Sequence, residues 1–251
     1  MPTLKDRLES SKVYFETIAA VLLSLMAILV SIAQSCTAAR QTDLLDKQTK
    51  IAEVQMLPEF NIYVQLEYDE QRKVYTEDTL VVDNNGGSAH EWNVQTAEFI
   101  VLTYGGPSKT IELAVNGYYG AAFRSAAHRG HLVTLRGSGN NNHFGDLYME
   151  LLDSHPCDVA LVDLDRYVRV SFKDVLGRRS TEYYNVAAVS GARHLPLEAG
   201  EAAFKRWESQ STSGQLLEFS RVTPDLLRSR LQGVCEQPSK LPGNDSRPGS
   251  D

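Results

Sequence analysis

The sequence predicts an N-terminal transmembrane helix and helical stalk, then a mainly-β antiparallel sandwich with an inserted helix and C-terminal helices. Three observations predict this architecture. Residues 17–39 form a run of 23 residues without a formal charge. After residue 57, short segments alternate between apolar and polar side chains and are separated by Gly- and Asn-containing turns, as half-buried strands are. Amphipathic segments of helical period interrupt and follow these strands.

The apolar run 17–39 is long enough to cross a bilayer, whose hydrocarbon core needs about 20 predominantly apolar residues in a helix. We expect a retained single-pass anchor in a cell membrane, preceded by a short flank over 1–16. A cleaved signal peptide is the alternative, but Asp6, Glu9 and Glu16 offset the basic charge that precedes the apolar core of such a peptide. Three basic residues lie near each end of the run, so the side of the membrane that holds the domain is undetermined.

Residues 40–56 contain no Gly or Pro, and Leu44, Leu45 and Ile51 recur at helical spacing. The helix is therefore expected to continue as a stalk of about 25 Å. A spacer helix is favoured over a dimerising coiled coil, because a coiled coil needs several heptads. Pro58 then ends the helix, since proline cannot donate a backbone hydrogen bond.

The sandwich is expected over 57–195. Its first strand is the clearest, because apolar residues occupy every second position from Phe60 to Tyr68. Further strands are predicted at 80–82, 92–102, 110–115, 118–123, 132–135, 159–162, 167–172 and 181–189. Asn and Gly residues over 83–88 predict a tight turn, and Gly177 is expected in a left-handed backbone conformation within a hairpin turn.

Two regions have a helical period instead. Apolar residues within 142–153 recur every three or four positions, which predicts a helix inserted between strands. C-terminal helices are expected over 196–235, where Thr223 and Pro224 have the residue types of an N-cap and a first helical position. Residues 236–251 are rich in Pro, Gly and Ser, a composition that predicts a disordered tail.

Three segments carry a resemblance: LPEFNIYVQLEY, LVVDNNGGSAHEWNV and YVRVSFKDVLGRRSTEYYNV. They resemble uncharacterised bacterial single-pass membrane proteins with a C-terminal immunoglobulin-like β-sandwich. The turn Asn85-Gly86-Gly87-Ser88-Ala89 is similar to one in bacterial immunoglobulin-like adhesion modules. The resemblance covers residues 17–190 and implies a fold. Its motifs are turns and strands, so it implies no chemistry.

Charge and cysteine content exclude some partners. The chain has a formal net charge of −7, and residues 58–190 contain 11 Lys and Arg against 18 Asp and Glu. We therefore expect no nucleic-acid partner, because phosphate contacts need a basic surface. Three cysteines are too few for a disulfide framework, although Cys157 and Cys235 could pair in an oxidising compartment.

No residue set has the spacing of a known catalytic or cofactor site, and we expect no cofactor. His128, His131 and His143 are weak metal candidates that match no zinc motif. Asp163 and Asp165 lie between two predicted strands, where alternation would put both side chains on one face, and a charged strand end is favoured over a cation site. The binding candidates lie on two predicted loops, since loops on a rigid scaffold carry recognition. They are Asn85, Gly86, Gly87, His90 and Trp92 on one loop, and Asn140, Asn141 and His143 on the other.

The sequence thus predicts a membrane-anchored binding module that has a protein partner or self-associates. Two alternatives stay open. The first is an effector that perturbs the membrane when the sandwich senses a ligand, because Ser24, Ala27 and Ser31 share a helix face suited to helix association. The second is a metal-dependent hydrolase that uses the three histidines.

Overall fold

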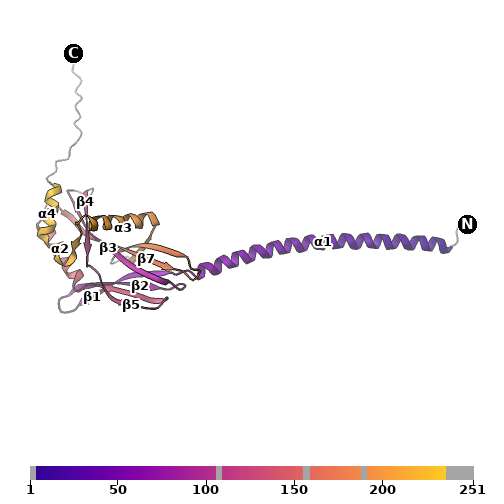
Figure 1. The fold of residues 1–251 in the computed structure, drawn as a ribbon, viewed down its shortest axis with the longest axis horizontal. Helices are drawn as coiled ribbons and strands as arrows, with labels where there is room; N and C mark the ends of the chain where they lie inside the picture. Colours follow the sequence, from indigo (N-terminus) through magenta and orange to yellow (C-terminus); the bar gives the residue numbers. More distant parts are fainter. Residues whose placement is uncertain (1–3, 106–108, 155–158, 188–190, 236–251) are drawn as a thin grey trace, which may run out of the picture. The chain divides into compact units, whose positions relative to one another are not determined.

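The computed structural model describes residues 4–105, 109–154, 159–187 and 191–235. The chain forms two compact units, Met1–Gln55 and Met56–Asp251 (Figure 1). The predicted tail 236–251 and Cys157 lie outside the described residues. The disordered tail and the Cys157–Cys235 pair therefore stay predictions.

The first unit is one helix, α1 (Leu4–Gln55), which joins the predicted anchor and stalk without a break. The described part of the chain has this one helix long and apolar enough to cross a membrane, by length and composition. No Gly or Pro interrupts it, and several of its polar side chains interact within the helix. Ser24 donates to the Ala20 carbonyl at 2.9 Å, and Lys47 pairs with Asp43 at 2.7 Å.

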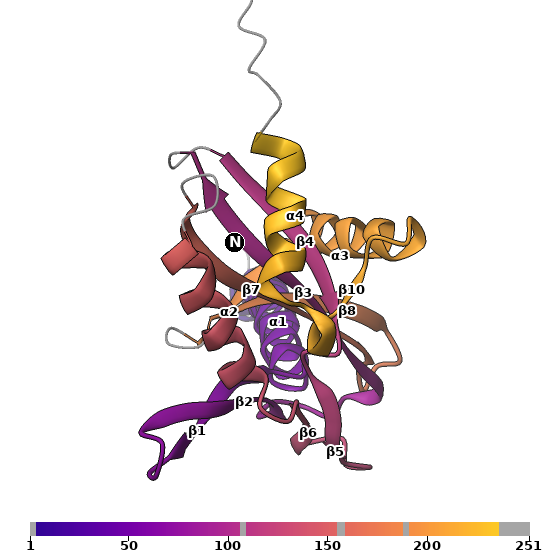
Figure 2. The same ribbon diagram turned by 90° about the vertical axis from the view of Figure 1, so that its left-hand side faces the viewer.

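The second unit contains two sheets and three α-helices (Figures 1 and 2). The four-stranded sheet has the order β1-β2-β6-β5, with β1 (Phe60–Asp69), β2 (Val74–Asn84), β6 (Gly130–Arg136) and β5 (Gly120–Arg124). The six-stranded sheet has the order β10-β4-β3-β7-β8-β9, with β10 (Leu217–Glu218), β4 (Lys109–Asn116), β3 (His90–Tyr104), β7 (Val159–Lys173), β8 (Arg179–Ala187) and β9 (Gly191–Leu195). Neighbouring strands are antiparallel except β10 and β4, which are parallel. The coarse prediction of an apolar helix followed by a mostly antiparallel β domain with helices is therefore confirmed.

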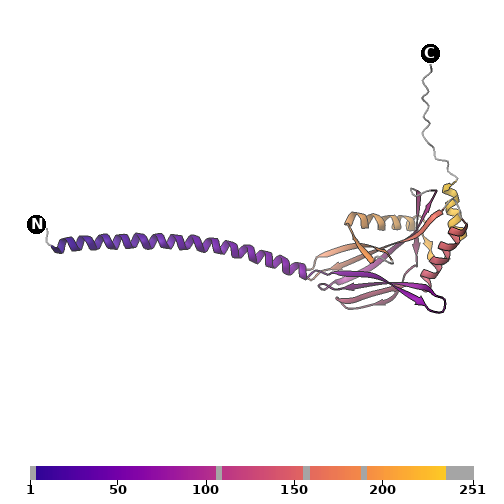
Figure 3. The same cartoon turned by 180° about the vertical axis from the view of Figure 1, so that it is seen from behind.

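Three clusters of buried side chains form the core. One lies between the two sheets and includes Leu80 and Val82 of β2 with Val168 and Val170 of β7. A second cluster lies under α2 (Asn140–Ser154) and α4 (Pro224–Cys235), which lie side by side (Figure 2). A third lies on the opposite face of the six-stranded sheet, under α3 (Leu197–Thr212) (Figure 3). The part of the six-stranded sheet under α3 is therefore buried on both faces.

Several strand boundaries differ from the sequence prediction, and β9 and β10 were not predicted. Two of the differences have a clear structural cause. The segments 159–162 and 167–172 belong to one strand, β7, which stays paired with β3 through the polar residues Asp163 to Arg166. The strand predicted at 118–123 begins at Gly120, because the chain turns at Gly117 (φ +79°) and crosses to the other sheet with Tyr118 buried. In both places a contact across the core, which no local pattern encodes, decides the outcome.

The packing of α3 against β8 gives a stability prediction. A methyl group on Gly200 would overlap the Tyr183 side chain, so Gly200→Ala should lower the free energy of unfolding by about 1–3 kcal/mol. The matched control is Gly145→Ala in α2, where a methyl group meets nothing within 4 Å. This control should be neutral or stabilising by up to about 1 kcal/mol. Urea unfolding followed by tryptophan fluorescence measures both, and equal effects would contradict the packing argument.

Candidate functional site

The glycines of the first predicted loop hold the segment that leads into β1. Gly87 donates its N–H to the Leu57 carbonyl at 2.7 Å, and Asn85 donates to the Glu59 carbonyl at 2.8 Å. A methyl group on Gly86 or Gly87 would overlap the backbone of this segment. These positions therefore require glycine for a close backbone approach. The same turn binds the start of the domain rather than presenting free side chains.

The other members of this loop are also engaged within the domain. Trp92 is buried and donates its Nε1–H to the Ala127 carbonyl at 2.9 Å, while the Arg124 guanidinium lies 4.7 Å from its ring centre. The rings of His90 and His128 lie 4.3 Å apart. Loop 124–131 thus packs on the first predicted loop at this end of the sheets.

The second predicted loop lies at the other end of β2. Asn140 is buried, and Asn141 donates to the Tyr75 carbonyl at 2.6 Å. His143 contacts the Val222 carbonyl through Nε2 at 3.0 Å. Asn84 and Asp78 mark the two ends and are six residues apart on β2, which corresponds to about 20 Å. The predicted binding residues therefore form two separate clusters.

The three histidines considered as metal ligands are divided between these ends. His128 and His131 lie at the first and His143 at the second. Within the described ranges, no three His, Cys, Asp or Glu side chains converge to hold a metal ion. Asp163 and Asp165 do lie on the same side of β7, where Asp163 accepts the N–H of Leu164 and Asp165 contacts the Tyr167 hydroxyl.

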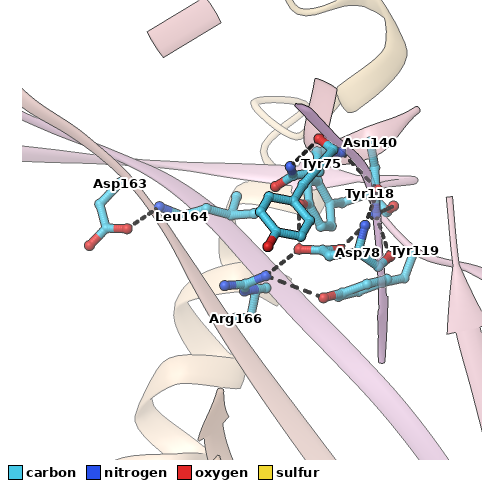
Figure 4. A network of polar contacts seen from close by, with 9 residues as sticks. Tyr75, Asp78, Tyr118, Tyr119, Asn140, Asp163, Leu164 and Arg166 are labelled. Atoms are coloured by element: carbon cyan, nitrogen blue, oxygen red, sulfur yellow. Dashed lines mark hydrogen bonds and ion pairs between the residues drawn. The ribbon is translucent and has the colours of Figure 1, made fainter. Parts of the chain in front are cut away.

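A buried polar network lies at the junction of the two sheets and α2 (Figure 4). Asp78 of β2 is 1% exposed and Arg166 of β7 is 6% exposed. The Arg166 guanidinium pairs with Asp78 Oδ2, which also accepts the Tyr118 hydroxyl at 2.8 Å. Asn140 Nδ2 donates to Asp78 Oδ1 at 2.8 Å. One carboxylate therefore joins a strand of each sheet, the crossing at Tyr118 and the start of α2.

The Asn140 side chain pairs with β2 where the neighbouring strand β6 has ended. β6 pairs with β2 only as far as Thr79, opposite Arg136, and the chain then leaves the sheet. At the next position of β2, the Asn140 amide accepts the N–H of Asp78 at 3.0 Å and donates to its carbonyl at 3.1 Å. The side chain thus continues the ladder that the backbone has left, and this contact positions α2.

Glu98 adds a second acidic group to this region. It lies opposite Arg166 in the β3–β7 register and is 3% exposed. Its Oε1 and the Arg166 Nε have no hydrogen-bond partner among the described residues. Burial raises the pKa of Glu98 from 4.5 to about 7, because removal from water disfavours the charged carboxylate. Two buried acids thus share one buried cation.

The sequence analysis did not identify this network, although a signal for it exists. Every second residue of β7 from Val162 to Phe172 is buried, and Arg166 is the one charged member of that row. A charged residue at a buried strand position indicates a partner across the core. The sequence does not say that the partner is Asp78, because the two residues are 88 positions apart.

The raised pKa of Glu98 makes stability depend on pH. Between pH 4.5 and about 7 the folded domain holds this proton more tightly than the unfolded chain, so the free energy of unfolding falls as pH rises. The difference between the two pKa values corresponds to a loss of about 3 kcal/mol in the free energy of unfolding, and this loss persists above pH 7. Glu98→Gln is neutral at every pH and should show a smaller loss between pH 5 and pH 8. Urea unfolding of both proteins between pH 5 and pH 8 measures this loss. An equal loss in the two proteins would contradict the prediction.

A second prediction concerns Asn140. Asn140→Ala leaves the buried N–H of Asp78 without its partner, so it should lower the free energy of unfolding by more than about 2 kcal/mol. Asn141→Ala is the matched control, because Asn141 makes an exposed hydrogen bond to Tyr75 and should cost about 1 kcal/mol or less. Thermal and urea unfolding compare the two variants. Equal losses would show that the Asn140 amide does not support the ladder.

The outer face of the four-stranded sheet carries a polar chain of three side chains. His131 Nδ1 lies 2.9 Å from Asp83 Oδ1, and its Nε2 lies 2.9 Å from the Thr134 hydroxyl. A carboxylate, an imidazole and a hydroxyl in this order resemble the orienting acid, base and nucleophile of a hydrolase. Acyl transfer also needs donors for the developing oxyanion. The strand that carries Thr134 is paired on both sides, with β2 and β5, so the local backbone is engaged in the ladder.

Within the second unit, a cluster of exposed apolar side chains lies at the tip of the β1–β2 hairpin, which we call the tip patch. Tyr68 and Tyr75 are 49% and 50% exposed, and their rings lie 5.1 Å apart edge to face. Val74 and Met149 extend the patch and are 41% and 59% exposed. An open groove of about 450 Å³ separates the hairpin from α2. It is lined by Lys73, Val74, Tyr75, Asn141, Asn142, Gly145, Asp146 and Met149.

Comparison with models of known protein families finds no match, and a search of curated protein sequences also finds none.

Proposed function

We propose that this protein is a membrane-anchored interaction module whose immunoglobulin-like domain binds a protein partner through the tip patch. The observation that carries the proposal is the exposed Tyr68–Tyr75 pair beside the groove on α2. Tyrosine and methionine are enriched where proteins bind one another. Tyrosine buries a large area and loses little side-chain entropy.

The strand order supports an immunoglobulin-like plan. Such sandwiches place strands A, B, E and D in one sheet and C, F and G in the other. In this chain β1-β2-β6-β5 takes the first order, and β4-β3-β7-β8 takes the order C′-C-F-G. Trp92 occupies the position of the buried tryptophan on strand C. In place of a disulfide between strands B and F, the Asp78–Arg166 ion pair joins β2 to β7.

The contacts of the segment Met56–Glu59 favour the tip patch over the opposite end. In antibody variable domains, recognition uses loops B–C and F–G. Here the corresponding B–C turn, with Gly86 and Gly87, holds the segment Met56–Glu59 that follows α1. The hairpin tip is about ten residues further along β1, or roughly 30 Å away. The segment Met56–Glu59 thus engages the B–C turn, so we expect the partner at the tip patch.

Site-specific photocrosslinking in cells tests the proposal on the full chain. With p-benzoylphenylalanine in place of Tyr75, we expect one discrete covalent adduct with a partner protein. The matched control places the same group at Leu176, which is also 50% exposed but lies in the turn between β7 and β8. No adduct is expected there.

Two exposed substitutions complete this test. Tyr68→Ala and Met149→Ala together should abolish the Tyr75 adduct and leave thermal unfolding nearly unchanged, because both side chains are largely exposed. Adducts of equal yield at Tyr75 and Leu176, or none at either position, would contradict a partner at the tip patch.

A further inference from the structure

The first half of β3 has an uncovered edge, on a surface separate from the tip patch. β3 pairs with β7 from His90 to Tyr104, whereas β4 pairs with it only from Glu98 to Tyr104. Within the described chain, no strand pairs with the other edge of residues 90–97. β4 ends at Asn116, and the turn at Gly117 then carries the chain to the other sheet.

Contacts from α3 show which way the backbone of β4 points. Gln210 accepts the N–H of Ala114 at 2.8 Å and donates to the Glu112 carbonyl at 3.1 Å. The Gln210 amide thus bonds to β4 as a neighbouring strand would, on the edge where β10 also pairs, so these backbone groups of β4 point away from β3. Backbone direction alternates along a strand, so Leu113 and Val115 point toward β3.

The same alternation fixes the direction of the groups on β3. Glu98 is the register partner of Val115, so its N–H and C=O point toward β4. The β3–β7 register is continuous from Asn93 to Thr103, so the alternation continues from Glu98 back toward Asn93. The N–H and C=O of Thr96 and Val94 therefore point toward the uncovered edge. They form a row of donors and acceptors at the spacing that a neighbouring strand requires.

A groove of about 300 Å³ lies along this edge. Tyr119 and Leu135 line the side toward the four-stranded sheet, and Phe204, Trp207, Arg169 and Glu208 line the side toward α3. Arg169 and Glu208 pair with each other at 3.4 Å, so these two side chains add no net charge. At the N-terminal end of β3, Arg124 donates to the Trp92 carbonyl at 3.0 Å, and this contact ends the open edge. The free edge thus spans Val94 to Thr96, or about 10 Å.

We propose that this groove binds an extended, uncharged segment of a partner polypeptide, which adds to β3 as a short strand. Its backbone pairs with Val94 and Thr96, because a peptide strand supplies alternating donors and acceptors at this spacing. Its side chains point alternately toward the Tyr119 wall and the Trp207 wall. The aromatic residues on both walls favour β-branched side chains over charged ones.

Fluorescence anisotropy on the full chain in detergent tests this proposal. The probe is fluorescein-labelled Thr-Val-Thr-Val-Thr-amide, and its partner probe carries an N-methyl group on all five residues, so that neither edge of the strand keeps its donors. N-methylation removes backbone donors and leaves the side chains in place, so the second probe should bind about tenfold or more weakly. Equal affinity of the two probes, or no binding of the parent peptide at about 1 mM, would overturn the proposal.

A pair of variants at Thr96 tests the protein side. Thr96→Pro removes the N–H that points to the open edge and leaves the β3–β7 ladder intact, as edge strands tolerate proline. Thr96→Ala is the matched control, because it loses the same side chain and keeps the N–H. Peptide affinity should fall about tenfold in the proline variant relative to the alanine variant.

Equal peptide affinity of the two variants would overturn the proposal. A wild-type oligomer that binds neither probe and becomes monomeric with Thr96→Pro in sedimentation would assign the edge to a second copy of the chain, and would also overturn it. If Thr96→Pro does not fold, the comparison of the two probes on the wild-type protein still decides the question.

Discussion

Asp78 and Arg166 form the one contact on which the arrangement of this domain depends. Both side chains are buried, and they join β2 of one sheet to β7 of the other. Removing two charges from water is costly, so such a pair adds little net stability over an apolar pair, but loss of either partner leaves an uncompensated buried charge. The pair therefore acts mainly on specificity. The sheets are held in the one register in which Asp78 meets Arg166, Tyr118 and Asn140.

Both proposed binding surfaces follow from this network. Asn140 ends the pairing of β6 with β2 and starts α2, so the β1–β2 hairpin extends past the rest of its sheet and exposes Tyr68 and Tyr75. Tyr118 is held by Asp78 where the chain crosses between sheets, so β4 ends at Asn116 and leaves the first half of β3 uncovered. Each surface lies where a buried polar contact stops a strand.

Glu98 connects this network to the pH of the surroundings. It lies opposite Arg166, and the pKa of about 7 means that its charge changes near neutral pH. Ionised Glu98 and Asp78 repel each other and compete for the same guanidinium. The domain is thus less stable when both acids are charged. Glu98 also lies at the strand position next to the uncovered edge of β3.

The sequence by itself determined the elements with a local signal. The charge-free run 17–39 indicates the apolar helix, the alternation from Phe60 to Tyr68 indicates β1, and the apolar spacing within 142–153 indicates α2. Gly177 has the left-handed conformation that its turn requires (φ +79°). Only the tertiary structure decided that β7 continues through Asp163 to Arg166 and that the two predicted loops lie at opposite ends of β2. It also decided which residues meet in the polar network. The physical reason is that period and turn chemistry act within a few residues, whereas the contacts of Arg166 with Asp78 and of Asn140 with Asp78 span 88 and 62 positions.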